Sequence, residues 1–239
     1  MSSITPVKPK EDISYPDSDG RPMGETPLHV LNFRWTLDAL ELFFATDPMV
    51  FIAGNMFVYY EKGNRHRHLS PDVFVVRGIP KVTTPARRSY FLWENKPIDF
   101  VLELTSSSTK GEDIDDKKDL YCNVLQVQEY FLFDPYAEYL DPPLQGFHLS
   151  GGQYVPIQPV ANRVSSNVLG LHLEADGEML RLYNPQSQSW LPYPPELDAR
   201  RQAAEAAAEL ERKARQAVAA EAERLRQENE ELRRQLGKS

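Results

Sequence analysis

Residues 98–105 read IDFVLELT, an apolar segment that carries two carboxylates, Asp99 and Glu103. Its β-branched and large apolar side chains predict a short strand that is buried on both faces. A polar stretch follows, then a helix of roughly residues 111–125, and residues 129–134 (EYFLFD) predict a further strand. A helix between two apolar strands is typical of parallel neighbours, because parallel strands need a crossover connection. We therefore expect an α/β fold with a mixed sheet.

The segments on either side extend this sheet. Apolar residues recur at helical spacing over residues 28–44, and Asp47-Pro48 ends that pattern. Residues 49–60 predict a strand with a bend or a hairpin, and residues 72–76 a second short strand. Short strand-like pieces separated by Gly, Pro and Asp over residues 137–183 predict a β-hairpin extension.

Composition divides the chain into three parts. Residues 1–26 are rich in Pro, Ser, Asp and Lys without periodicity, and we expect a disordered tail there. Residues 27–195 form the expected globular domain, which ends in a connector with four prolines between Asn184 and Pro195. Residues 196–239 are expected to form a C-terminal helix.

Several features bear on the compartment. No run approaches 18 consecutive apolar residues, so we expect no membrane span. The N-terminal residues lack the apolar stretch of a secretory signal, and Cys122, the single cysteine, excludes an internal disulfide. These features predict a cytoplasmic protein.

The charge of the chain argues against broad attraction to nucleic acid. Ten basic and ten acidic residues after Pro195 cancel, so the net charge of −8 lies entirely on residues 1–195. Phosphate contacts need Lys and Arg. Any DNA contact would depend on local clusters, which are equally compatible with solvated loops: Arg65-His66-Arg67-His68, and Lys81 with Arg87 and Arg88.

Candidate chemistry lies between residues 72 and 121. A buried carboxylate such as Glu103 is costly unless it is paired, protonated or bound to a metal. Asp72 stands at the start of the neighbouring strand, and Asp99 shares a face with Glu103 because side chains alternate along a strand. Two or three carboxylates from adjacent strands could therefore hold Mg²⁺.

The following helix supplies further polar groups. Asp113, Lys117 and Tyr121 are spaced by four and share one helix face. A lysine beside a metal could stabilise charge on a phosphoryl oxygen. Alternatively, Asp113 and Lys117 are an exposed ion pair worth only about 0.3–0.5 kcal/mol, and Glu103 is neutralised by an arginine.

These motifs resemble the Uma-two family, bacterial proteins described as restriction endonucleases of the PD-(D/E)xK superfamily. The resemblance covers roughly residues 28–183, and its specific part runs from Asp72 to Pro135. The segments that carry it are Pro71-Asp72-Val73, residues 101–109 (VLELTSSST), Asp113 with Lys117 and Tyr121, residues 129–135 (EYFLFDP), residues 53–60 (AGNMFVYY) and residues 141–146 (DPPLQG).

The resemblance implies a restriction-endonuclease-like mixed sheet flanked by helices, in which Asp72 and Glu103 bind Mg²⁺ or Mn²⁺ and Lys117 is the catalytic lysine. It implies hydrolysis of DNA phosphodiester bonds. One position departs from the superfamily pattern, because Thr105 stands where an E-x-K motif has lysine. Lys118 is the second candidate for the amine, although it points about 100° away on the helix.

Two other residues, His29 and Cys122, are weaker candidates for a functional role. His29 precedes the first helix, and many members of the family have a histidine near there, but we expect a surface histidine rather than a ligand. Cys122 is expected to be a small buried residue rather than a nucleophile.

The tail predicts self-association. Residues 196–236 are rich in Ala, Glu, Arg, Leu and Gln and contain neither Gly nor Pro. Val218, Leu225 and Leu232 recur every seven residues, and Ala222, Asn229 and Leu236 follow each by four. This is an a/d coiled-coil seam with Asn229 at an a position, which predicts a parallel homodimer. A solitary charged helix is the alternative.

Two functions are compatible with these features. The first is a metal-dependent endonuclease acting on DNA. The second is a catalytically silent nuclease fold that serves as a binding or regulatory module and self-associates through its coiled coil.

Overall fold

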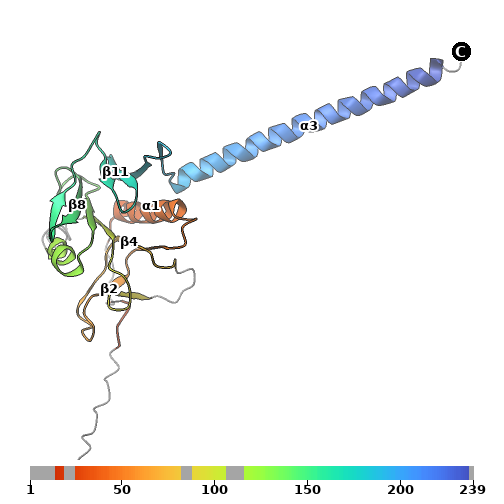
Figure 1. The fold of residues 1–239 in the computed structure, drawn as a ribbon. Coiled ribbons are helices and arrows are strands. Elements are labelled where there is room, and N and C mark those ends of the chain that lie inside the picture. Colours follow the sequence, from red (N-terminus) through yellow and green to blue (C-terminus); the bar gives the residue numbers. More distant parts are fainter. Residues whose placement is uncertain (1–13, 19–24, 82–87, 106–115, 237–239) are drawn as a thin grey trace, which may run out of the picture. The chain divides into compact units, whose positions relative to one another are not determined.

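A computed structural model describes residues 14–18, 25–81, 88–105 and 116–236 (Figure 1). The chain divides into two compact units, Met1–Leu191 and Pro192–Ser239. Among the described helices, none is both long enough and apolar enough to cross a membrane.

The first helix, α1 (Pro27–Phe43), begins where the sequence provides both a cap and a suitable first residue. The Thr26 hydroxyl accepts a hydrogen bond from the His29 backbone N–H at 3.3 Å, and Pro27, which lacks an N–H, occupies the first helical position. The helix ends just before Asp47-Pro48, so the predicted helix at 28–44 is confirmed.

The centre of the first unit is a six-stranded sheet in the order β1-β4-β6-β7-β8-β9. Its strands are β1 (Val50–Ala53), β4 (Val73–Arg77), β6 (Phe100–Leu104), β7 (Glu129–Phe133), β8 (Leu144–Ser150) and β9 (Gln153–Pro156). Only β6 and β7 pair in parallel, with Glu103 opposite Leu132, and the other neighbours are antiparallel. The mixed α/β sheet expected from residues 98–134 is confirmed.

The crossover between β6 and β7 contains the second helical segment. Its described part comprises α2 (Lys118–Leu120) and the π-helical turn η2 (Tyr121–Leu125). Gln126, at φ 51°, ends the turn, and the chain enters β7 three residues later. Every residue of β6 and β7 is buried, as the apolar runs predict for central strands.

The two faces of this sheet have separate cores. One face packs against α1 and against a second sheet, through Leu40, Phe100, Leu102, Leu173 and Leu182. The opposite face packs against η2 and a small third sheet, through Val58, Tyr90, Val101, Tyr121 and Tyr130. Alternation along each strand therefore decides which core a side chain enters.

The second sheet corrects one expectation. Residues 137–183 do not form a single hairpin extension, because only β8 and β9 extend the central sheet. The rest form a separate four-stranded sheet of β10 (Val164–Ser166), β11 (Leu171–Asp176), β12 (Met179–Asn184) and β13 (Ser189–Trp190). The physical reason is that alternate residues of β11 and β12, such as Leu171 and Leu180, bury one face against the core that contains α1.

The third sheet consists of β3 (His68–Leu69), β2 (Phe57–Tyr59) and β5 (Ser89–Phe91). Because β1 and β2 lie in different sheets, residues 49–60 form a strand with a bend at Gly54-Asn55 and no hairpin.

Part of the expected N-terminal tail contacts the third sheet. Tyr15 packs against the rings of Tyr59, Phe91 and Trp93, and its hydroxyl accepts a hydrogen bond from the Gly63 N–H at 2.7 Å. Within the segment expected to be a tail, residues 14–18 therefore contact the third sheet through an aromatic side chain. Residues 25 and 26 of that prediction lead directly into α1, and residues 1–13 and 19–24 lie outside the described part of the chain.

The second unit is dominated by one helix, α3 (Pro194–Leu236). The predicted helix at 196–236 is confirmed. It begins two residues earlier, and the Glu196 carboxylate accepts a hydrogen bond from the Tyr193 N–H at 3.0 Å near its start.

Candidate functional site

Asp72 lies immediately before β4, on the strand that neighbours β6. Val73 pairs with Leu102, so one further step of this antiparallel register brings Asp72 opposite Glu103. Asp72 Oδ2 accepts a hydrogen bond from the Leu104 backbone N–H at 2.7 Å. The side chain is thus held at the end of the ladder, largely buried and directed at the strand that carries Glu103.

A close backbone approach fixes the segment before Asp72. The Asn55 N–H donates to the Pro71 carbonyl at 2.9 Å, which brings the bend between β1 and β2 against this segment. A Cβ atom on Gly54 would lie 2.3 Å from the Asp72 carbonyl oxygen. Only glycine permits this approach, so the Gly-Asn bend supports the position of Asp72.

Glu103 is fully buried and both of its carboxylate oxygens are engaged. Lys117 Nζ lies 3.1 Å from Oε2, and the Tyr121 hydroxyl donates to Oε1 at 2.5 Å. Burial, reinforced by the negative charge of Glu103, raises the pKa of Tyr121 well above its ordinary value, so the phenol stays protonated and remains a donor. The negative charge of Asp72 raises this pKa further.

The helix after β6 presents its side chains as the spacing predicts. Lys117 and Tyr121, four residues apart, both reach Glu103. The adjacent Lys118 points elsewhere, and its Nζ lies 3.7 Å from the centre of the Phe147 ring. Asp113, the third member of the predicted helix face, lies outside the described residues.

His29 corrects an expectation. It was expected to be a surface histidine, but it is buried in the first turn of α1, and its Nε2 lies 3.3 Å from Asp72 Oδ1 and 3.7 Å from Glu25 Oε1. The helix start set by Thr26 and Pro27 brings the imidazole to Asp72. A histidine near the first helix in related proteins was the only sequence signal for this contact.

Asp99 does not supply the additional metal ligand that its place on the strand suggested, and Thr105 makes a structural hydrogen bond. Asp99 precedes β6 at the opposite end from Thr105, and its carboxylate accepts hydrogen bonds from the Arg77 N–H at 2.6 Å and from Gln128 Nε2 at 2.8 Å. The expectation that Asp99 joins a metal site is not supported by its position. Thr105, at the lysine position of E-x-K, is buried and donates its hydroxyl to the Phe133 carbonyl.

The donor set fits a magnesium ion in kind. Asp72 and Glu103 offer hard carboxylate oxygens, and Mg²⁺ is commonly held by one or two carboxylates while it retains several waters. Within the described residues there is no group of three or more His, Cys, Asp and Glu side chains arranged to hold a metal. The candidate site therefore consists of two carboxylates from adjacent strands, a lysine and a tyrosine from the next helix, and a histidine beside Asp72.

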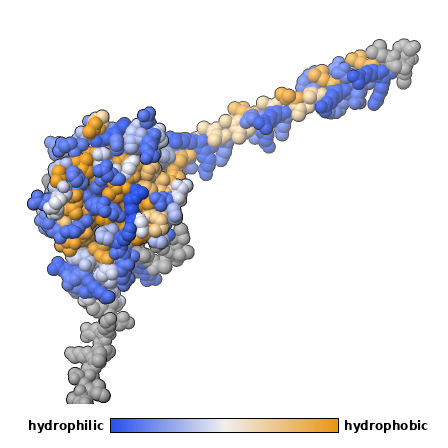
Figure 2. Space-filling model, in the orientation of Figure 1, coloured by the Kyte–Doolittle hydropathy of each residue, from blue (hydrophilic) through white to orange (hydrophobic). Residues whose placement is uncertain are grey.

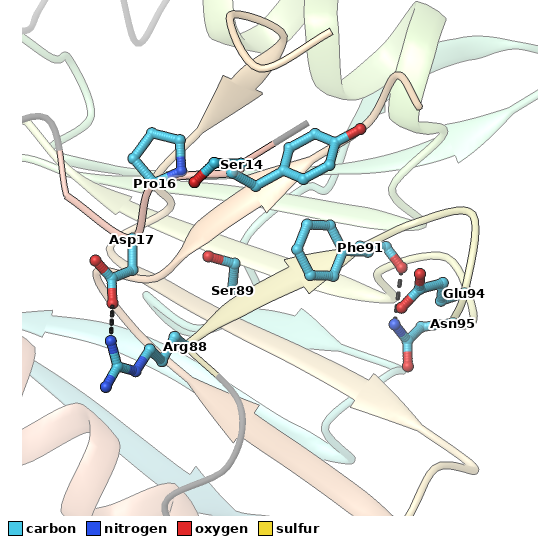
Figure 3. A pocket seen from close by; sticks show the side chains of 9 residues that line it. Ser14, Pro16, Asp17, Arg88, Ser89, Phe91, Glu94 and Asn95 are labelled. Carbon is cyan, nitrogen blue, oxygen red and sulfur yellow. Dashed lines mark hydrogen bonds and ion pairs between the residues drawn. The ribbon is translucent and has the colours of Figure 1, made fainter. Parts of the chain in front are cut away.

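Two surface hollows among the described residues lie elsewhere. One, of about 670 Å³, is lined by Tyr15, Asp17, Arg88 and Phe91 among others, and Figure 3 shows Arg88 paired with Asp17 beside it. The other, of about 830 Å³, adjoins Asp99, Glu129 and His148. Neither is lined by Asp72, Glu103 or Lys117, and because each carries charges of both signs, neither is a basic groove.

The described members of the predicted basic clusters lie on loops, except for His68, which begins β3. Arg65, His66 and Arg67 are exposed between β2 and β3, and Arg67 is paired with Glu61 at 3.5 Å. Arg87 lies outside the described residues. Cys122 is buried, as expected, with its Sγ 3.5 Å from the Gly152 carbonyl.

Comparison with known proteins agrees with the resemblance. The model of the Uma2 family, described as "Putative restriction endonuclease", matches residues 5–176. A crystal structure of "a putative nuclease belonging to DUF820" from Anabaena variabilis is similar at 14% identity and a TM-score of 0.48, over 66% of this chain and 82% of that one. No curated protein matches the chain. Since the family model spans well over half of its length, the chain belongs to the Uma2 (Uma-two) family of restriction-endonuclease-like proteins.

Proposed function

We propose that this chain is a metal-dependent endonuclease that hydrolyses DNA phosphodiester bonds, with Asp72 and Glu103 as metal ligands and Lys117 as the catalytic lysine. One observation carries the proposal. Glu103, fully buried on a central strand, lies in register with Asp72 and within 3.1 Å of the Lys117 amine. Membership of a nuclease family supports the reaction class.

The metal would be Mg²⁺ or Mn²⁺. Bound to the two carboxylates, the cation would supply activation of a water molecule and neutralisation of charge on the phosphoryl group. The chain itself positions the ligands, because the Leu104 N–H holds Asp72 and the Tyr121 hydroxyl holds Glu103. The Lys117 ammonium adds a fixed positive charge that can stabilise charge developing on a phosphoryl oxygen.

His29 extends the proposed machinery. Its Nε2 lies next to the Asp72 oxygen that is not used by Leu104. A histidine at this place can orient the carboxylate or contact the substrate phosphate. Groups that orient metal ligands commonly contribute 10–100-fold to metal affinity or activity.

The proposal is tested by incubating purified full-length protein with supercoiled plasmid, linear duplex and single-stranded DNA in Mg²⁺ or Mn²⁺. We expect cleavage that EDTA abolishes. Asp72→Asn is the sharpest variant, because the amide oxygen can still accept the Leu104 hydrogen bond while the charge is lost. Intact substrates under all of these conditions, with no difference between Asp72→Asn and the wild type, would overturn the proposal.

A second candidate is a silent nuclease fold that binds or regulates a partner. Two observations favour it: both Glu103 oxygens are already engaged by Lys117 and Tyr121, and Thr105 replaces the E-x-K lysine. Calorimetric titration with Mg²⁺ and Mn²⁺ separates the candidates. Heat of binding that Glu103→Ala abolishes supports the nuclease, and no binding in the wild type supports the silent fold.

We propose in addition that two copies of the chain associate through residues 196–236 of α3. Its exposed apolar seam supports this association. The cytoplasmic location stays a prediction from the sequence.

A further inference from the structure

The second unit presents an apolar stripe to solvent. Val218, Leu225 and Leu232 recur every seven residues along α3, and their side chains are exposed by 70%, 46% and 51%. Figure 2 shows apolar residues along one side of this helix and hydrophilic residues along the other. A repeat of seven keeps such a stripe facing a second helix that coils around the first.

The charges that flank the stripe follow the same repeat. With Val218, Leu225 and Leu232 at d positions, Glu221 and Glu228 fall at g positions. The e positions that follow each by five residues hold Arg226 and Arg233. One flank of the stripe is therefore acidic and the other basic over two successive heptads.

We propose that the occupant of this stripe is a second copy of the same chain, and that the two α3 helices run parallel and in register. In that arrangement a g residue of one helix faces the e residue five positions later on its partner, so Glu221 meets Arg226 and Glu228 meets Arg233, twice by symmetry. In an antiparallel pair, g faces g and e faces e, which places Glu against Glu and Arg against Arg. The charge pattern favours the parallel arrangement and opposes the other.

Asn229 specifies the register. It occupies the a position between Leu225 and Leu232, and its side-chain amide donates to the Leu225 carbonyl at 2.9 Å. A single asparagine at an a position is best satisfied by its own copy across an in-register dimer, because any shift would place it against apolar side chains. The seam is short, since Arg215 and Glu211 occupy the next a and d positions toward the N-terminus.

Existing ion pairs along the helix do not prevent this exchange. Arg224 lies 2.7 Å from Glu221, and Arg226 lies 3.9 Å from Glu223, but all of these side chains are more than half exposed. Exposed pairs of this kind contribute little, so interhelical partners can replace them.

The orientation is tested with cysteines in the full-length chain. Leu232→Cys and Val218→Cys are prepared separately, and each is oxidised alone and as an equal mixture. Residues 218 and 232 lie about 21 Å apart along a helix axis, at 1.5 Å per residue, and a disulfide needs Cα atoms within about 7 Å. A parallel in-register pair therefore joins 218 to 218 and 232 to 232, whereas an antiparallel pair centred on the seam separates both like pairs and brings residue 218 of one helix within about one turn of residue 232 of the other.

We expect each variant to form disulfide dimers when it is oxidised alone. In the mixture we expect the 218–232 product to stay at the background level, which is the amount of disulfide dimer that the unmutated chain forms through Cys122. Predominant 218–232 product, identified by peptide mass, would overturn the parallel arrangement. Absence of all cross-links would overturn it as well.

A charge test uses two matched variants. Glu221→Lys/Glu228→Lys places Lys opposite Arg in the parallel pair, and we expect self-association to weaken at least tenfold by sedimentation. Glu223→Lys/Glu230→Lys makes the same change of charge at b positions on the outer face, and we expect less than a threefold effect. Equal effects of the two variants would contradict the facing of g and e residues.

This inference rests on the proposed self-association and not on the proposed nuclease activity. A monomer at tens of micromolar, unchanged when residues 197–239 are deleted, rejects the association itself. A dimer with 218–232 cross-links rejects only its orientation, and DNA cleavage is measured separately from both.

Discussion

Glu103 and Glu129 are two buried glutamates on neighbouring parallel strands, and their surroundings differ. Glu103, near the end of β6, faces the core that contains Tyr121 and is held by an ammonium group and a phenol. Glu129, at the start of β7, faces the other side of the sheet. Ser166 Oγ donates to its Oε2 at 2.5 Å, and the Asn167 N–H donates to Oε1 at 2.8 Å.

The difference teaches that burial of a carboxylate does not by itself mark a reactive site. Glu129 fastens the turn after β10 to the central sheet, since its partners are a hydroxyl and backbone N–H groups of that turn. Glu103 has a cationic partner in Lys117, and a second carboxylate, Asp72, stands opposite it, as the proposed metal site needs. The partners, rather than the burial, separate a structural acid from a candidate ligand.

The largest expected contrast between the two acids is in catalysis. Glu103→Gln removes one of the two proposed metal ligands, and we expect DNA cleavage to fall at least about 100-fold, since even outer-shell changes cost 10–100-fold. Glu129→Gln is expected to leave the rate within a factor of two. Initial rates of plasmid nicking in Mn²⁺ measure both, with circular dichroism as the check on folding, and similar losses in the two variants would contradict the assignment.

A contrast in stability separates the two adjacent lysines. Lys117→Ala leaves Glu103 buried without its cationic partner. Breaking a fully buried ion pair lowers the free energy of unfolding by about 3–5 kcal/mol. Because Lys117 is partly exposed, we expect a somewhat smaller loss of about 2–4 kcal/mol. Lys118→Ala loses its contact with Phe147, worth about 0.5–1 kcal/mol. Urea denaturation measures the loss of unfolding free energy in the two variants. A loss in Lys118→Ala that equals or exceeds the loss in Lys117→Ala would contradict Lys117 as the cationic partner of Glu103.

Tyr121→Phe sharpens the account of how Glu103 is held. The change deletes only the hydroxyl that donates to Oε1, and a hydrogen bond to a charged group contributes about 1.5–3 kcal/mol. We expect a loss of unfolding free energy near the lower end of that range, because Lys117 remains. Tyr154→Phe is the matched control, since its hydroxyl donates to the Val127 carbonyl, which is neutral. An equal loss in both variants would argue against a charged Glu103.

The smallest expected effect concerns pH and Glu129. Burial raises the pKa of this carboxyl above 4.5, although the hydrogen bonds from Ser166 and Asn167 partly oppose the shift. The folded protein therefore favours the protonated Glu129 more than the unfolded chain does. This contribution to the free energy of unfolding is complete below pH 4.5, the ordinary pKa, and is lost as the pH rises through the higher folded-state pKa. Each pKa unit corresponds to about 1.4 kcal/mol. Glu129→Gln should therefore gain stability relative to the wild type between pH 4.5 and 7, and denaturation curves with parallel pH profiles would contradict this.

Much of the local structure was predictable, because it follows from short-range patterns. Apolar residues at helical spacing and the break at Asp47-Pro48 predicted the first helix close to its observed bounds, and the apolar run after Ile98 forms a doubly buried strand. The spacing of Lys117 and Tyr121 predicted that both would share a face. The contact of His29 with Asp72 was not predictable from such patterns, because it joins positions more than forty residues apart.

The sequence by itself determined the order of elements, the family, the heptad repeat of the tail and the residue types available for a site. The family is recognised from the resemblance of whole motifs, and the other features follow from periodicity, turn chemistry and composition, which act over a few residues. Only the tertiary structure decided that Asp99 lies at the opposite end of its strand from Thr105, that Glu129 fastens a second sheet and that His29 reaches Asp72. Those outcomes depend on strand register and on which core each face enters, and both are set by contacts between segments distant in the chain.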